Sequence, residues 1–139
     1  MYLLDTNVVS EFRHIANGRG EPRVGEWVSR QTQNLLFVSA ITLFELEMGI
    51  LLMERRDARQ GAALRGWMKG FLLPTFANRI LSVDEAVARA CAALHVPDPA
   101  PIPDSLIAAT ALVHGLTVAT RNTGDFGRLG VPVLNPWLP

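Results

Sequence analysis

The stretch YLLDTNVVSE, residues 2–11, places an aspartate directly after a short apolar run. The run YLL at 2–4 predicts a short buried strand, because continuous apolar runs are typical of strands that are covered on both faces. Asp5 then stands at the end of this strand, where an aspartate can serve as a turn residue, a helix cap or a metal ligand. The positions of the other carboxylates decide between these roles.

Short apolar runs alternate with helical patterns along the rest of the chain. Further strands are predicted at 35–40, 79–83, 116–120 and 131–135, and helices at 22–33, 41–56, 58–74, 104–115 and in AVARACAALH, which follows Asp84-Glu85. This alternation predicts parallel strands with helices on both faces. We therefore expect a three-layer α/β/α fold around a central parallel sheet of about five strands, in a single domain that spans 1–139.

Composition limits the class of protein. The chain has 139 residues, no net charge and 49% hydrophobic residues, which is too apolar for a disordered segment. No apolar run approaches the ~18 residues of a membrane span, and no signal peptide pattern is present at the start. A single cysteine, Cys91, cannot form an internal disulfide, and we expect it to be buried. These features favour a cytoplasmic protein that does not contact a membrane.

Three more carboxylates lie near the predicted strand ends. Glu45 is one turn into the helix after the second strand, Asp104 begins the helix before the fourth, and Asp125 follows the fourth. Each has an ordinary explanation as a helix cap. Thr42 and Glu45 match a capping box, and Asp104 and Asp125 can each cap a helix.

Two features favour a shared site over separate caps. The helical neighbours of Glu45 and Asp104 are apolar, so both carboxylates are expected on stripes that face the sheet, where an uncompensated charge is costly. Doubly wound sheets also bring their strand ends to one edge, where carboxylates repel one another. Without His or Cys partners, such oxygens select a hard cation, Mg²⁺ or Mn²⁺, and suit hydrolysis of a phosphodiester.

The chain resembles the PIN-domain family, and in particular its VapC-like toxins and their FitB-like relatives. The resemblance covers the whole chain and rests on LLDTNVVSE (3–11), VSAITLFELEMGI (38–50), PDSLIAATALVHGLTVATRNTGDF (103–126) and VPVLNPW (131–137). It implies a metal-dependent endoribonuclease toxin of a type II toxin–antitoxin system, which cuts RNA and is neutralised by a cognate antitoxin. The alternative is a catalytically silent PIN-fold module that acts through protein or RNA contacts.

The resemblance also assigns the acidic centre. Asp5, Glu45 and Asp104 are the implied catalytic, metal-binding carboxylates. The fourth acidic position of the family varies between the places that Asn122 and Asp125 occupy here. We assign Asp125 as the fourth carboxylate and Asn122 as a neutral accessory.

Supporting residues are expected around these carboxylates. Ser39 and Thr120 are the small polar residues expected at the strand ends, and Thr6 and Asn7 are expected to fix the rotamer of Asp5 and to cap the next helix. Arg121 is expected either to contact RNA phosphate or to pair with a site carboxylate. The three histidines are not expected to be ligands: His14 in an exposed loop, His95 before a proline-rich loop, and His114 at a helix end.

Two other classes of protein with aspartates at strand ends fit less well. A phosphate-receiver domain needs an acidic pair after the first strand and a lysine after a late strand, whereas the only lysine here is Lys69. A haloacid-dehalogenase-type phosphatase needs a second aspartate where Asn7 stands.

A helical hairpin at 41–74 is the expected partner surface. ILLM (50–53) and FLL (71–73) are apolar and are surrounded by basic residues. We expect part of this surface to form a homodimer and part to form a groove for an acidic amphipathic segment of an antitoxin, either in that dimer alone or in a larger toxin–antitoxin assembly. The basic residues of 50–79 are either a solvated helix face or a surface that tracks RNA phosphates.

Overall fold

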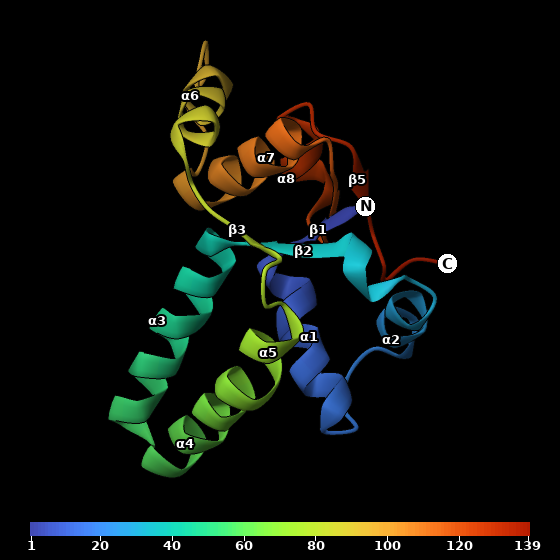
Figure 1. Ribbon diagram of the computed structural model, residues 1–139, viewed down its shortest axis with the longest axis vertical. Helices are drawn as coiled ribbons and strands as arrows, with labels where there is room; N and C mark the ends of the chain where they lie inside the picture. The colour runs from blue at the N-terminus through green and yellow to red at the C-terminus, as the bar shows by residue number, and fades with distance from the viewer.

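The computed structural model describes residues 1–139 as helices on both faces of a parallel sheet (Figure 1). The spatial order of the strands is β3-β2-β1-β4-β5, and every neighbouring pair is parallel. Their bounds are β1 (Tyr2–Leu4), β2 (Leu36–Ser39), β3 (Ile80–Leu81), β4 (Thr117–Ala119) and β5 (Val133–Leu134). The predicted three-layer α/β/α fold with five parallel strands is confirmed.

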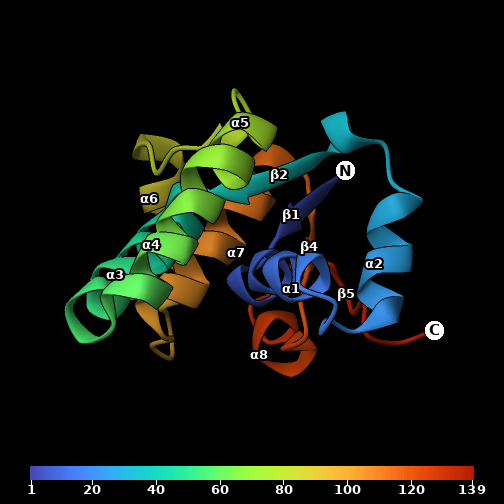
Figure 2. The ribbon, with the colours of Figure 1, turned by 90° about the horizontal axis from the view of Figure 1, so that it is seen from below.

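Two helical layers cover the sheet (Figures 1 and 2). One layer holds α1 (Thr6–Ala16), α2 (Pro22–Ser29), α3 (Ala40–Arg56), α4 (Ala58–Trp67) and α5 (Leu73–Thr75), with a 3₁₀ turn at Gln33–Leu35 and a π-helical turn at Met68–Leu72. The other holds α7 (Ile102–His114) and α8 (Thr123–Gly127), with α6 (Glu85–Leu94) packed on the outer side of α7. No helix is both long enough and apolar enough to cross a membrane.

The first strand shows how the layers form. Successive side chains of a strand point to opposite faces, and the fully buried Leu3 and Leu4 belong to different cores. Leu4 packs in the cluster that includes Val38 and Phe76 on the α1–α5 side, and Leu3 packs in the cluster that includes Ile107 on the α7 side. Because β1 is buried on both faces at the centre of the sheet, Asp5 is held at the middle of the edge where the carboxyl ends of the strands lie.

Several helices and strands begin or end at other residues than predicted. The helix expected at 22–33 ends at Ser29, and the strand expected at 35–40 spans Leu36–Ser39. The helix expected at 104–115 begins earlier, at Ile102, because a proline is well accommodated in the first turn of a helix. Its predicted end is confirmed, since Gly115 adopts a left-handed φ of 67° as the C-cap.

The segment after Asp5 contains a longer helix than the sequence pattern indicates. Residues 6–16 form the 11-residue helix α1, so His14 lies in an exposed last helical turn and not in a loop. Asp5, and not Thr6 or Asn7, is the N-cap of this helix. Cys91 is buried, as expected.

The α3–α4 hairpin is broken at Asp57, as expected, and Asp57 caps α4 by accepting hydrogen bonds from the backbone N–H groups of Arg59 and Gln60. The two helices approach closely at Gly61, where an added Cβ would lie 2.6 Å from the Cα of Glu54. The hairpin extends away from the sheet (Figure 1).

Two arginines of the basic stretch at 50–79 serve the fold itself. The guanidinium of Arg65 donates hydrogen bonds to Glu47 Oε1 at 2.7 Å and to Glu54 Oε1 at 3.1 Å. The guanidinium of Arg79 donates to backbone carbonyl oxygens, among them that of Gln33 at 2.6 Å. Because these cations already have partners, the stretch is not a continuous surface of free positive charge.

Candidate active site

Asp5 is buried, with 5% of its surface exposed, whereas Glu45 and Asp104 are half-buried and Asp125 is exposed. Asp5 Oδ1 accepts a hydrogen bond from the backbone N–H of Thr6 at 2.7 Å, and its Oδ2 accepts one from the hydroxyl of Thr120 at 2.8 Å. Thr120 directly follows β4, and the strand order reverses between β1 and β4. Open α/β sheets bind ligands in the crevice at this reversal, so Asp5 and Thr120 lie at the expected ligand-binding position.

Burial raises the pKa of Asp5 from its ordinary 3.8 to about 6. The hydrogen bonds from Thr120 and Thr6 lower the pKa, whereas the nearby charges of Asp104 and Glu45 raise it. The net shift shows that the fold keeps a carboxylate where its ionised form is unfavourable. Such a position is a candidate functional site when it also lies at the open edge of the sheet.

Glu45 is held by Thr6, its neighbour across the crevice. The hydroxyl of Thr6 donates a hydrogen bond to Glu45 Oε1 at 2.6 Å and lies 3.1 Å from the buried hydroxyl of Thr42. The capping-box explanation of Thr42 and Glu45 is therefore wrong, because the N-cap of α3 is Ser39. Glu45 is free of the capping role, and its charge raises the pKa of Asp5.

The expectation that Glu45 lies on a buried apolar stripe is also wrong. Its helical neighbours Met48 and Leu52 are among the exposed large hydrophobic residues of the chain. Polar contacts with Thr6, and not an apolar surround, keep this carboxylate at the site. Asp104 fits the expectation better, because Ile107, Ala108 and Ala111 on its helix are fully buried, although Leu112 is exposed.

Asp104 lies in the first turn of α7 and is half-buried. Burial raises its pKa, and the charges of Glu45 and Asp125 raise it further. Because Asp104 contributes to the shift of Asp5 as well, the four predicted carboxylates form one electrostatic group. The sheet edge thus brings together residues that lie 120 positions apart in sequence, from Asp5 to Asp125.

Asp125 and Asn122 lie at the open side of this group. Asp125 is in α8, is exposed, and forms an ion pair of 3.1 Å with Arg128, one turn along the same helix. The backbone N–H of Asn122 donates to the hydroxyl of Thr120 at 2.9 Å, so Asn122 supports the residue that holds Asp5. Its own side chain caps no helix.

The remaining predicted supporting residues have other contacts. Ser39 is the N-cap of α3, and its buried hydroxyl accepts a hydrogen bond from the N–H of Ile41. Asn7 Oδ1 accepts one from the backbone N–H of Arg121 at 3.4 Å, which ties α1 to the end of β4. The guanidinium of Arg121 lies over the ring of Trp137, 5.4 Å from its centre, and not against a site carboxylate.

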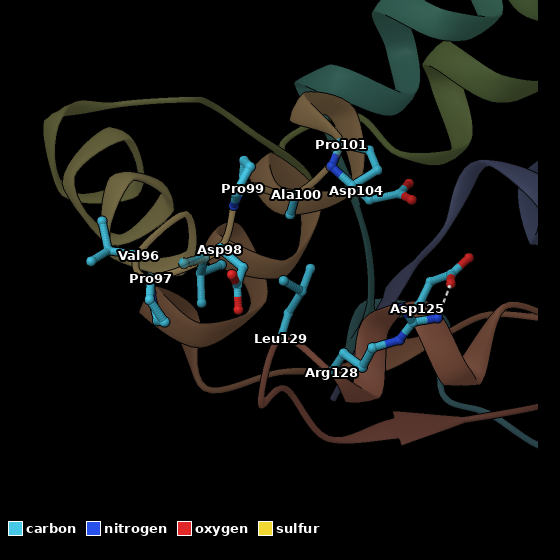
Figure 3. Close-up of a pocket in the computed structure, with 11 residues that line it drawn as sticks. Val96, Pro97, Asp98, Pro99, Ala100, Pro101, Asp104, Asp125, Arg128 and Leu129 are labelled. Carbon is cyan, nitrogen blue, oxygen red and sulfur yellow. Dashed lines mark hydrogen bonds and ion pairs between the residues drawn. The ribbon is translucent and has the colours of Figure 1, made fainter.

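Two hollows open beside the carboxylates. One, of about 570 Å³, is lined by Asp104, Asp125 and a proline-rich loop (Figure 3). The other, of about 310 Å³, is lined by Thr6 and Glu45 together with Arg13 and His14. Each hollow combines apolar residues with charged ones, and each includes an arginine, Arg128 in the first and Arg13 in the second.

The donor set suits a hard divalent cation. It consists of carboxylate oxygens, and none of the chain's ion pairs neutralises Asp5, Glu45 or Asp104. No three acidic, histidine or cysteine side chains stand close enough to enclose an ion together. A cation that keeps several waters and takes only one or two carboxylates directly, as Mg²⁺ does, is compatible with this spacing.

Sequence reasoning missed Thr42, Arg128 and Asp98. Thr42 was placed in a capping box, and only the packing of α1 against α3 shows its hydroxyl beside Thr6. Arg128 lies three residues after Asp125, the spacing at which helical side chains meet, so its pairing could have been found. Asp98, in the proline-rich loop VPDPAPIP at 96–103, carries no signal in the sequence that sets it apart from a solvated loop residue, but it lines the larger hollow.

Comparison with known proteins places this geometry in a family. The PIN domain profile matches residues 2–131. The chain is 40% identical over 143 residues to the toxin FitB of Neisseria gonorrhoeae, with 99% of each chain covered. It is 35% identical over 144 residues to the VapC ribonuclease Y4jK of Sinorhizobium fredii, covering 100% of this chain and 99% of that protein.

A solved structure agrees with these matches. The crystal structure of FitAcB from Neisseria gonorrhoeae contains a chain that superposes with a TM-score of 0.89 at 38% identity, with 100% of both chains covered. Its fold and the order of its elements are therefore those of the present chain over their full length. The chain belongs to the PIN domain family.

Proposed function

We propose that the chain is a metal-dependent endoribonuclease and the toxin of a toxin–antitoxin pair, with Asp5, Glu45, Asp104 and Asp125 as its acidic centre. The observation that carries this proposal is the state of Asp5, a buried carboxylate that is kept beside other acids and raised in pKa to about 6. A module that only bound partners would be more stable with a neutral residue there. The names of the relatives, a toxin and a VapC ribonuclease, agree with this function.

The contacts of Asp5 define what it offers to a ligand. An ionised carboxylate has about four lone-pair sites on its two oxygens. The N–H of Thr6 occupies one site on Oδ1, and the hydroxyl of Thr120 occupies one on Oδ2. Asp5 is thus fixed in orientation and keeps one free site on each oxygen.

Glu45 and Asp104 complete the group from the two flanking helices. The hydroxyl of Thr6 engages Glu45 Oε1 and leaves Oε2 without a protein hydrogen-bond donor. Together with Asp5, these residues would hold Mg²⁺ or Mn²⁺, one or two of them directly and the rest through the ion's waters. The ion would supply an activated water and offset charge on the phosphate during hydrolysis. Arg13 and His14, in the neighbouring hollow, are placed to contact the RNA backbone beyond the carboxylates.

Substitution of Asp104 tests the proposed activity. We expect Asp104→Asn to abolish Mg²⁺- or Mn²⁺-dependent cleavage of a fluorescent RNA, and excess EDTA to abolish cleavage by the unmodified chain. Glu85→Gln is the matched control. Glu85 is an exposed acid in the first turn of α6, so this substitution removes one negative charge away from the site. Equal cleavage by Asp104→Asn and the control would contradict the proposal.

The partner surface that we propose lies on α3. Phe44, Met48, Leu51 and Leu52 are 51%, 48%, 53% and 62% exposed, and clustered apolar side chains of this kind mark protein interfaces. The predicted segments 50–53 and 71–73 contribute only in part, because Ile50 and Leu72 are buried in the core. We propose that this face forms a homodimer contact or receives the antitoxin.

Light scattering after size-exclusion chromatography tests this surface. We expect Leu52→Glu to shift the chain toward monomer or to weaken capture of the protein encoded next to it, while RNA cleavage is unchanged. Arg55→Glu, at the exposed end of the same helix, controls for added negative charge. An unmodified chain that stays monomeric and binds no such protein would contradict the assignment.

A further inference from the structure

The larger hollow has the make-up of a small-ligand site, and its volume of about 570 Å³ is in the usual range for one. Its walls come from the loop between α6 and α7, from the first turn of α7 and from α8. Asp104 and Asp125 form the edge nearest the acidic centre (Figure 3). A group bound here would lie directly beside the phosphate at the carboxylates.

The walls of this hollow combine apolar and charged residues. They include the flat rings of three prolines and the side chains of Leu94, Val96 and Leu129. The carboxylate of Asp98 points from the loop toward Leu129 (Figure 3), and none of the chain's four ion pairs involves it. Proteins recognise unstacked RNA bases by stacking them on aromatic rings or guanidinium planes and by hydrogen bonds to the base edges. In this hollow the flat surfaces are the Arg128 guanidinium and the proline rings, and Asp98 supplies the hydrogen-bond acceptor.

The negative charge of Asp98 decides which part of RNA fits. Asp98, Asp104 and Asp125 outnumber the one cation of the hollow, Arg128, whose guanidinium is paired with Asp125 at 3.1 Å. A phosphate group would therefore be repelled, so the occupant is a base and not the backbone. Guanine alone among the four bases presents two adjacent donors, N1–H and the N2 amino group, on its Watson–Crick edge. Two carboxylate oxygens can accept both at once, which makes this pairing strong and geometrically specific.

The loop that carries Asp98 is fastened to the turn that carries Asp104. The ring of His95 accepts a hydrogen bond from the N–H of Ala100 at its Nδ1, at 3.3 Å, and its Nε2 lies 2.9 Å from the hydroxyl of Ser105. Ser105 is fully buried and follows Asp104 in α7. These contacts join the loop at Ala100, two residues after Asp98, to the turn that carries Asp104.

We propose that this hollow is a nucleobase subsite that selects a guanine adjacent to the cleaved phosphate, with Asp98 as the residue that reads its Watson–Crick edge. This inference rests on the proposed ribonuclease function and adds the base preference of the same site. It assigns the hollow to RNA and not to a protein partner.

Cleavage of matched RNAs tests the subsite. The RNAs share one sequence and differ only at the positions flanking the cut, which carry guanine, inosine, adenine, cytosine or uracil. We expect kcat/KM for guanine at one flanking position to exceed that for adenine or uracil by about 10-fold, the scale of a bidentate base contact. Inosine, which lacks the N2 amino group, should lose most of this preference.

Asp98→Asn should lower kcat/KM for the guanine RNA to the value for the adenine RNA, because an amide offers one acceptor and one donor. Glu85→Gln serves as the control again, and should keep the preference. Guanine preference that persists in Asp98→Asn, or unmodified protein that shows no preference, would overturn the proposal. Asp98 is exposed, so the fold of the variant is expected to be intact and a thermal melt verifies it.

A binding measurement separates this inference from the ribonuclease activity. If no RNA is cleaved, the proposed function fails, and the subsite is tested by fluorescence anisotropy with the same RNAs in metal-free buffer. We expect tighter binding of the guanine RNA than of the inosine RNA by the unmodified chain and equal binding by Asp98→Asn. Equal affinities for both RNAs in the unmodified chain would show that the hollow does not read guanine and is left for a protein partner.

Discussion

Asp5 and Asp125 both lie beyond strand ends at one edge of the sheet, but the fold treats them differently. Asp5 is buried, caps α1 and is held by Thr6 and Thr120. Asp125 is exposed, and its only ion pair is with Arg128, whose side chain is 80% exposed. Exposed pairs of this kind contribute little to stability. The difference indicates a site with a rigid inner carboxylate and an adaptable outer one.

Removing the inner carboxylate should have the largest effect. We expect Asp5→Asn to lower RNA cleavage by about 10³-fold or more, the scale seen when a group that stabilises transition-state charge is lost. The fold should persist, because an amide oxygen can still accept the hydrogen bond from the N–H of Thr6. Kinetics at saturating Mn²⁺ and a thermal melt test both points, and cleavage at the unmodified rate would remove Asp5 from the centre.

The same residue should make stability depend on pH in metal-free buffer. The pKa of Asp5 is about 6 in the folded chain against its ordinary 3.8, so between these values the folded state binds more protons than the unfolded state. Stability from this group therefore rises as pH falls from about 6 to about 4, by about 3 kcal/mol in all. Urea unfolding at pH 7 and at pH 4 measures most of this change.

Asp5→Asn supplies the comparison for that experiment. The variant should be more stable than the unmodified chain at pH 7, where the buried carboxylate is ionised, and the difference should shrink toward pH 4. Identical pH profiles for the two proteins would show that Asp5 is not the titrating group.

Loosening the support of Asp5 should have a smaller effect than removing it. We expect Thr120→Val to lower activity by about 10- to 100-fold, as for other groups that orient metal ligands, and to cost about 1–3 kcal/mol of stability. Valine keeps the shape but cannot donate to Asp5 or accept from the N–H of Asn122. Thr120→Ser, which keeps the hydroxyl, should retain most of the activity, and equal loss in both variants would point to packing.

The outer carboxylate should show the smallest effect. We expect Asp125→Ala to raise the Mn²⁺ concentration needed for half-maximal activity by about 10-fold, the lower end of the range for groups around a metal site. Asn122→Ala should do less, because its side chain makes no capping bond and an amide binds a hard cation more weakly than a carboxylate. A larger effect of Asn122→Ala would exchange the two assignments.

The sequence by itself determined the order of the elements and the chemistry of the site. The short apolar run YLL forms β1, which lies at the centre of the sheet and is covered on both faces. A continuous apolar run suits a strand in that position because both of its faces are buried. Carboxylates that follow such runs come to one edge because all five strands are parallel. These features are local patterns in the chain, and simple rules of strand and helix packing connect them.

Only the tertiary structure decided how each carboxylate is held. Thr42 and Glu45 match a capping box in sequence, but α1 places the Thr6 hydroxyl beside both, and Ser39 caps α3. The bond from Thr120 to Asp5 joins residues 115 positions apart.

The surface around the site depends on the same long-range packing. Whether Leu52 faces the core or solvent depends on where α4 packs against α3, and Asp98 lines a hollow because His95 fastens its loop to α7. Hydrogen bonds and burial between distant segments depend on relative positions in space, which no local pattern in the chain encodes.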